Sequence, residues 1–178
     1  MGADFKTQMI SLTRRYLYIS IALAVPLLSL ISPHWISINS LRPNWAVLWL
    51  LPWSIHEGPW NGMFAGFCLG MLMDASYLEG PTQLPALIAL GFFWGQIGQA
   101  SKTKLADKIF SLGLLSWIGA FASGLSIWCQ QLLLFPKNIP FFFHDWAFQV
   151  IFAQALITSL LSPVIVSLTN KYFFNTKK

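Results

Sequence analysis

The sequence predicts an all-α integral membrane protein, a bundle of about six transmembrane helices. Of its 178 residues, 56% are hydrophobic and only 10% are charged, and the mean hydropathy is +0.60. A soluble domain carries about 25% charged residues, so this chain lacks the charge that a water-facing surface requires. The nine tryptophans fit the same class, because amphipathic indole rings collect at the two membrane interfaces.

Apolar segments along the chain predict where the helices lie. We expect a single membrane domain over residues 1–178, with helices near residues 16–33, 42–55, 60–78, 84–99, 109–135 and 146–169. The second segment is too short to cross about 30 Å of hydrocarbon at about 1.5 Å per residue. It is therefore expected to recruit residues near Leu41 or to lie where the bilayer is locally thinned.

Basic residues decide between six membrane spans and five. If the short second segment crosses, only Arg42 and Lys137 lie opposite the termini, and nine of the eleven Lys and Arg residues share the termini's side. With five spans, four lie on the amino-terminal side and seven opposite. Cytoplasmic segments are enriched in Lys and Arg, so we expect six spans with both termini in the cytoplasm. The net charge of +5 forms no patch or stripe of the kind that binds nucleic acid.

The third segment carries small residues at helical spacing. Gly62, Gly66, Gly70 and Asp74 are four residues apart and follow one stripe of a helix. Glycines at this spacing let a second helix approach closely, and close packing drives helix association in lipid. The stripe either packs against another helix of the same chain or docks a helix of a partner protein. The first interpretation is favoured, because six helices need internal contacts.

Asp74 is the one carboxylate inside a clearly predicted span. A charge at bilayer depth costs a few kcal/mol, so we expect this side chain to be buried against protein or to face water. It can accept hydrogen bonds from a helix end or from a basic group such as Arg42. It can alternatively coordinate a proton, an ion or a ligand, but a single carboxylate without a charged relay favours the structural role.

Catalytic and metal-binding patterns are absent from the sequence. It contains no HExxH metal pair and no GxSxG nucleophile motif. His34, His56 and His144 fall in predicted loops on alternating sides, and Cys68 and Cys129 have no CxxC spacing. We therefore expect no catalytic residues, no metal site and no cofactor.

A group of residues between positions 42 and 87 resembles a known family. Arg42, Pro43 and Asn44 precede a short apolar helix; the glycine stripe ending in Asp74 follows, and then Gly80 and Pro81. This arrangement resembles the rod shape-determining protein MreD family. The pattern of that family usually reads Gly-Pro-Leu-Gly at this turn, whereas Thr82 and Gln83 stand at the last two positions here.

The resemblance implies a noncatalytic scaffold or regulatory subunit of the bacterial complex for cell shape and lateral peptidoglycan synthesis, the elongasome. It implies a multi-pass protein of the inner (plasma) membrane. The implied direct partner is an MreC-like single-span protein with an extracytoplasmic domain. The actin-like protein MreB and the enzymes of cell-wall synthesis are implied as indirect partners.

The resemblance also implies a six-helix arrangement similar to the substrate-binding subunits of energy-coupling-factor transporters. The alternative function is therefore a membrane subunit that binds a small, vitamin-like molecule. Such a subunit needs a pocket with convergent polar groups on the extracytoplasmic side. The predicted spans contain few polar side chains that could line one, and this favours the assembly role; they are Asp74, Gln96, Gln130, Gln131, Gln149 and Gln154.

Overall fold

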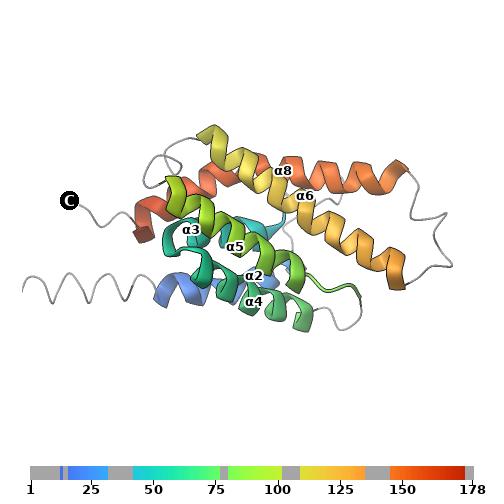
Figure 1. The fold of residues 1–178 in the computed structure, drawn as a ribbon, viewed down its shortest axis with the longest axis horizontal. Helices are drawn as coiled ribbons and strands as arrows, with labels where there is room; N and C mark the ends of the chain where they lie inside the picture. Colours follow the sequence, from blue (N-terminus) through green and yellow to red (C-terminus); the bar gives the residue numbers. More distant parts are fainter. Residues whose placement is uncertain are drawn as a thin grey trace, which may run out of the picture.

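The computed structural model describes residue 13 and residues 16–31, 42–76, 80–101, 109–134 and 145–174. Within these ranges every regular element is helical, and the expected all-α class is confirmed (Figure 1). The helices are α2 (Ala24–Ile31), α3 (Trp45–Glu57), α4 (Pro59–Ser76), α5 (Leu84–Ser101), α6 (Ile109–Leu134) and α8 (Asp145–Thr169), followed by the π-helical segment η2 (Asn170–Phe174). The expected helix ends at residues 32–33, 77–78 and 135 lie outside the described residues, as does Leu41.

The first apolar segment is helical from residue 16 but bends at Leu23, one residue before α2. Pro26 explains the bend, because its ring has no N–H and clashes with the carbonyl four residues earlier. The amide of Leu23 instead donates to the carbonyl of Ser20, at 3.2 Å, in a tighter turn. The two parts together form the first helical segment.

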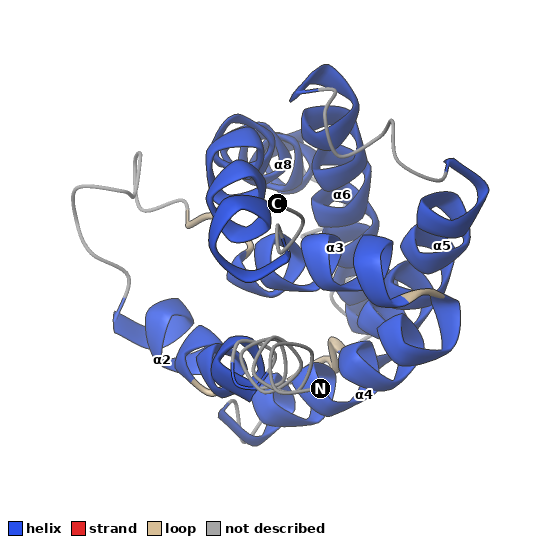
Figure 2. Cartoon of the chain, turned by 90° about the vertical axis from the view of Figure 1, so that its left-hand side faces the viewer, coloured by secondary structure: helices blue, strands red, loops and turns tan. Residues whose placement is uncertain are grey.

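Helix α3 forms the centre of the bundle. All nine residues from Ala46 to Ser54 are buried, and α3 contacts α2, α4, α5, α6 and α8. Seen end-on, it lies between the α4–α5 pair and the α6–α8 pair (Figure 2). Its 13 residues span about 20 Å. Because protein and not lipid surrounds this helix, its length need not match the thickness of the hydrocarbon layer.

The start of α3 differs from the expected one. The helix begins at Trp45 and not at residue 42, because Asn44 occupies the N-cap position with an extended backbone. Pro43 directly precedes this cap and disfavours a helical conformation in the residue before it. The described helix therefore gains no length from Arg42 or Pro43.

Two antiparallel pairs enclose α3. Helix α4 packs along the whole of α5, and α6 packs along α8. A sharp turn at Gly58 (φ 91°) connects α3 to α4, a backbone conformation that favours glycine. The carbonyl of Gly58 accepts the amide of Gly62 at 2.8 Å, and Pro59 takes the first helical position, where a missing N–H costs nothing.

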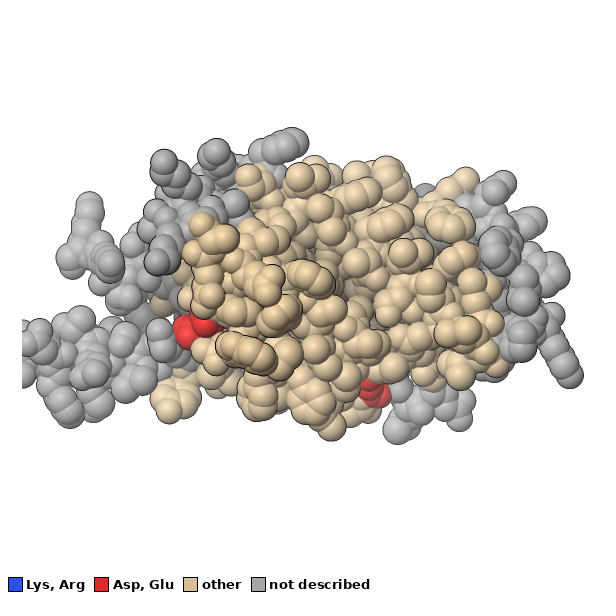
Figure 3. All heavy atoms as spheres, in the orientation of Figure 1, with Lys and Arg blue, Asp and Glu red and all other residues tan. Residues whose placement is uncertain are grey.

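The outer surface of the bundle is suited to lipid. Two described helical stretches, Ser111–Leu134 and Phe148–Phe173, are each long and apolar enough to cross a membrane. Large apolar side chains point outward, among them Leu160 (76% exposed) and Trp60 (71% exposed). Figure 3 shows a face that is almost entirely uncharged across the described helices. Apolar surface this extensive is typical of a face that contacts lipid or another protein.

Candidate functional site

Many of the polar side chains that link different helices gather at one end of the bundle, where α4 ends and α3 and α5 begin. We call this region the polar end. It comprises the entry to α3 (Arg42, Pro43 and Asn44), Asp74 near the end of α4, the turn Gly80–Gln83, and Gln130 of α6. From Arg42 to Gln130, the residues of the polar end span 88 positions of the sequence.

Asn44 joins three helices. Its side-chain oxygen accepts the amide of Val47 at 3.2 Å and caps α3. Its side-chain nitrogen donates to the hydroxyl of Ser123 on α6 at 2.7 Å. Its backbone amide donates to the hydroxyl of Thr158 on α8 at 3.0 Å. Asn44 therefore attaches the central helix to the α6–α8 pair.

Arg42 acts at the end of a different helix. Its guanidinium donates to the carbonyl of Ser29 at 3.0 Å, in the last turn of α2. Basic side chains are favourable at this position, because carbonyls at a helix C-terminus lack partners and carry partial negative charge. The hydrogen bond of Arg42 thus goes to α2 and not to Asp74. Pro43, between Arg42 and Asn44, is buried.

Asp74 fastens the turn that leads into α5. Its two carboxylate oxygens accept the hydroxyl of Thr82 and the amide of Gln83, the latter at 2.9 Å. The hydroxyl of Thr82 also accepts the amide of Leu84 at 3.1 Å, at the start of α5. Asp74 is half-buried, because α4 ends two residues later, at Ser76.

The same turn is tied to α6 by Gln130. Its side-chain oxygen accepts the amide of Thr82, and its side-chain nitrogen donates to the carbonyl of Thr82, both at 2.8 Å. The role of Thr82 was not predicted from the sequence; the one signal was that it departs from the family pattern. Gly80 (φ 140°) and the half-buried Pro81 shape the turn, and this φ requires glycine.

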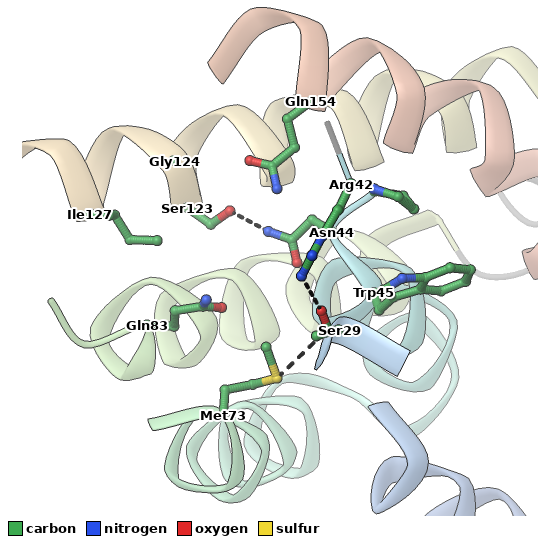
Figure 4. Close-up of a pocket in the computed structure, with 11 residues that line it drawn as sticks. Ser29, Arg42, Asn44, Trp45, Met73, Gln83, Ser123, Gly124, Ile127 and Gln154 are labelled. Carbon is green, nitrogen blue, oxygen red and sulfur yellow. Dashed lines mark hydrogen bonds between the residues drawn. The ribbon is translucent and has the colours of Figure 1, made fainter. Parts of the chain in front are cut away.

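A small cavity of about 110 Å³ lies between these elements (Figure 4). Its lining includes Arg42, Asn44, Gln83 and Gln154. Two lining residues carry a buried polar atom that has no hydrogen-bond partner among the described residues: the Oε1 atom of Gln83 and the Nε1 atom of Trp45. One atom is an acceptor and the other a donor. Leaving such atoms unmatched costs about 1–3 kcal/mol each, and both residues line the cavity.

The glycine stripe of α4 lies against α5 of the same chain. Gly62, Gly66 and Gly70 are buried. A Cβ atom added at Gly62 or Gly66 would overlap the carbonyl oxygen of Gly91 or Leu87, respectively. One added at Gly70 would lie 2.8 Å from the Cα of Leu84. We call this contact the glycine seam; α5 covers it, so a partner helix cannot reach it.

The remaining titratable candidates are dispersed. The Nε2 atom of His56 lies 2.8 Å from the Oδ1 atom of Asn170, at the end of the bundle opposite the polar end. His34 and His144 lie outside the described residues. The described ranges contain no group of three His, Cys, Asp or Glu side chains placed to hold a metal ion.

The fold and the polar end define an all-helical membrane protein whose polar side chains mainly join helices to one another. The family model for the rod shape-determining protein MreD matches residues 9–176. The chain therefore belongs to the MreD family, which are membrane proteins that act in rod shape determination. No curated protein and no solved structure matches the chain.

Proposed function

We propose that the chain is a noncatalytic scaffold or regulatory subunit of the complex for cell shape and lateral peptidoglycan synthesis. We further propose that its polar end docks the extracytoplasmic, membrane-proximal part of an MreC-like single-span protein. Through this partner the chain would act indirectly on MreB and the wall-synthesis enzymes. The observation that carries the docking site is the small cavity with unmatched polar atoms on Gln83 and Trp45.

At the polar end, where a vitamin-like molecule would need convergent polar groups, the size of the cavity favours assembly. Sites for small molecules usually measure about 300–1,000 Å³, whereas this cavity measures about 110 Å³. It has room for a side chain or a peptide group but not for a vitamin. Asp74 and Gln130 each bond to Thr82, so these groups hold the turn and are not positioned as free acid, base or nucleophile. Both features support a noncatalytic role.

We also propose a multi-pass orientation in the bacterial inner membrane, with both termini in the cytoplasm and the polar end outside. In this orientation nine of the eleven Lys and Arg residues would lie on the cytoplasmic side and two outside. Such an excess of basic residues is typical of cytoplasmic segments. In a background without Cys68 and Cys129, cysteines at positions 104 and 177 should resist impermeant thiol reagents in intact cells, and cysteines at positions 39 and 138 should react. Labelling of position 104 from outside would exclude this orientation.

Replacing Gln83 with methionine separates stability from partner binding. The change removes an unmatched buried oxygen, so the free energy of unfolding should rise by about 1 kcal/mol. The same change removes the acceptor offered to the partner, so co-purification of the single-span protein should fall. The backbone bond from Gln83 to Asp74 is retained.

Gln96→Met is the matched control, because Gln96 is exposed on α5 outside the polar end. It should leave both thermal stability and co-purification unchanged. The docking proposal fails if Gln83→Met is stable and retains the partner as fully as Gln96→Met does.

A further inference from the structure

The entry to α3 lies deeper in the bundle than the rest of the polar end. The side chain of Asn44 bonds to Ser123 of α6, whereas the turn at Thr82 bonds to Gln130 of the same helix. Positions 123 and 130 are seven residues apart, a rise of about 10 Å along α6. Ser123 is also near the middle of Ser111–Leu134, the stretch that is long and apolar enough to cross a membrane. The start of α3 is therefore recessed to the middle of this stretch.

Arg42 brings a positive charge to the recess. It is the one charged residue among the described residues that line the cavity of about 110 Å³. Its guanidinium has five N–H donors, and the Nη1 atom donates to the carbonyl of Ser29. An ionisable side chain at membrane depth faces protein or water and is usually paired with an opposite charge or with a backbone carbonyl. Within the described ranges, the lining of the cavity supplies the carbonyl but no carboxylate.

Further N–H donors lie at the same level. The Nε1 atom of Trp45 is buried and has no hydrogen-bond partner in the part of the chain that the structure describes. The first four amides of a helix lack carbonyl partners within it and carry partial positive charge. Asn44 accepts two of these amides in α3, those of Val47 and Leu48. The amides of Trp45 and Ala46 remain, so the recess is electropositive.

An acceptor lies on the other side of the cavity. Figure 4 shows Gln83 across the cavity from Arg42, Asn44 and Trp45. The buried Oε1 atom of Gln83 accepts no hydrogen bond from the described residues. An acidic residue of a peptide matches both sides, because its carboxylate accepts hydrogen bonds while a peptide N–H beside it donates one. The cavity has room for one such side chain.

We propose that the recess binds an acidic side chain of the docked partner. Its carboxylate pairs with the guanidinium of Arg42 and accepts the Nε1 hydrogen of Trp45, while a peptide N–H of the same segment donates to Gln83. Hydrogen bonds between charged groups are shorter and stronger than neutral ones, so this residue fixes the position of the partner. The inference rests on the proposed docking of an MreC-like protein and adds the chemistry by which that protein is recognised.

Replacing Trp45 with 3-benzothienylalanine tests the donor. Sulfur takes the place of the indole N–H in this amino acid, and the shape of the ring is kept. The melting temperature of the free chain should not fall, because the Nε1 atom has no described partner to lose. The dissociation constant for the single-span partner, measured by thermophoresis in detergent, should rise about tenfold, since a hydrogen bond to a charged group is lost.

The same replacement at Trp60 is the matched control. Trp60 is 71% exposed on α4 and lies outside the polar end, so neither measurement should change. An unchanged dissociation constant for the variant at position 45 would overturn the role of Trp45. A lower melting temperature together with weaker binding would make Trp45 a structural residue and would also overturn that role.

Arg42→Lys tests the carboxylate, because it keeps the positive charge and supplies an amine. In the purified complex, a membrane-permeant carbodiimide joins an amine to a carboxylate in contact with it, with loss of water. Mass spectrometry should identify a crosslink from position 42 to an acidic residue of the partner. Ala75→Lys is the matched control, because Ala75 is exposed at the same end of α4 but does not line the cavity. No crosslink from position 75 is expected.

A photoreactive amino acid at position 83 separates failure of this inference from failure of the docking proposal. A partner adduct from position 83 without a crosslink from position 42 would overturn the acidic side chain and leave the docking in place. Absence of both would overturn the docking and this inference with it. A crosslink from position 42 to an acidic residue of the same chain would show that the chain fills its own recess, and it would also overturn the inference.

Discussion

Replacing Gly66 with alanine is expected to remove most of the folded protein from the membrane. The added Cβ atom would overlap the carbonyl oxygen of Leu87 and lie 2.8 Å from its carbonyl carbon. Both atoms belong to the backbone of α5, so no side-chain rotation relieves the clash. Overpacking typically costs about 1–3 kcal/mol of folding stability, and the cost at Gly66 should lie at the upper end of that range. Membrane abundance and thermal stability in detergent measure the effect.

Gly113→Ala is the matched control for this substitution. Gly113 also lies within a long helix, but a Cβ atom there would meet the Ser159 hydroxyl at 3.5 Å, an ordinary contact. This variant should accumulate as the natural chain does. If the two variants accumulate equally, the α4–α5 contact is looser than the structure indicates and the glycine seam loses its structural role.

Asn44→Ala is expected to destabilise the polar end and to abolish rod-shape complementation. The substitution removes the cap of α3, worth about 1 kcal/mol. It also removes the hydrogen bond to the buried Ser123, which adds about 1–2 kcal/mol. The entry to α3 would then separate from α6, and the cavity beside it would lose its shape. Thermal stability, partner co-purification and cell shape are the measurements.

Asn44→Ser separates the two contributions of Asn44. Serine is nearly as good an N-cap as asparagine, but its shorter side chain cannot reach Ser123. It should recover the stability due to the cap while complementation stays impaired. Full activity of Asn44→Ala would show that the attachment of α3 to α6 is dispensable.

Hydrophobicity and glycine spacing predict much of this fold from the sequence. The apolar runs give the helices, because an apolar segment in lipid must satisfy its backbone hydrogen bonds internally. The spacing of Gly62, Gly66 and Gly70 indicates a closely packed face. It does not indicate which helix covers that face, because Gly91 and Gly95 of the fourth segment and Ser116, Ala120 and Gly124 of the fifth have the same spacing of small residues.

The central position of α3 is not predictable from its composition. A short run of apolar residues can cross a thinned bilayer or lie inside a bundle, and both require the same residue types. The small cavity at the polar end also cannot be predicted from the sequence. It depends on contacts such as that between Thr82 and Gln130, which are 48 residues apart. Asp74 is conspicuous as a lone carboxylate, but its partners are a hydroxyl and a backbone amide, which can be recognised only once the turn before α5 is placed.

Crosslinking from the polar end tests the proposed docking most directly. A photoreactive diazirine amino acid is placed at position 83 in cells that contain the whole complex, and a second strain carries it at position 89. Ala89 is exposed on the outer side of α5, away from the cavity. The docking proposal predicts an adduct with the single-span partner from position 83 and none from position 89. An adduct only from position 89, or from neither position in an assembled complex, would contradict it.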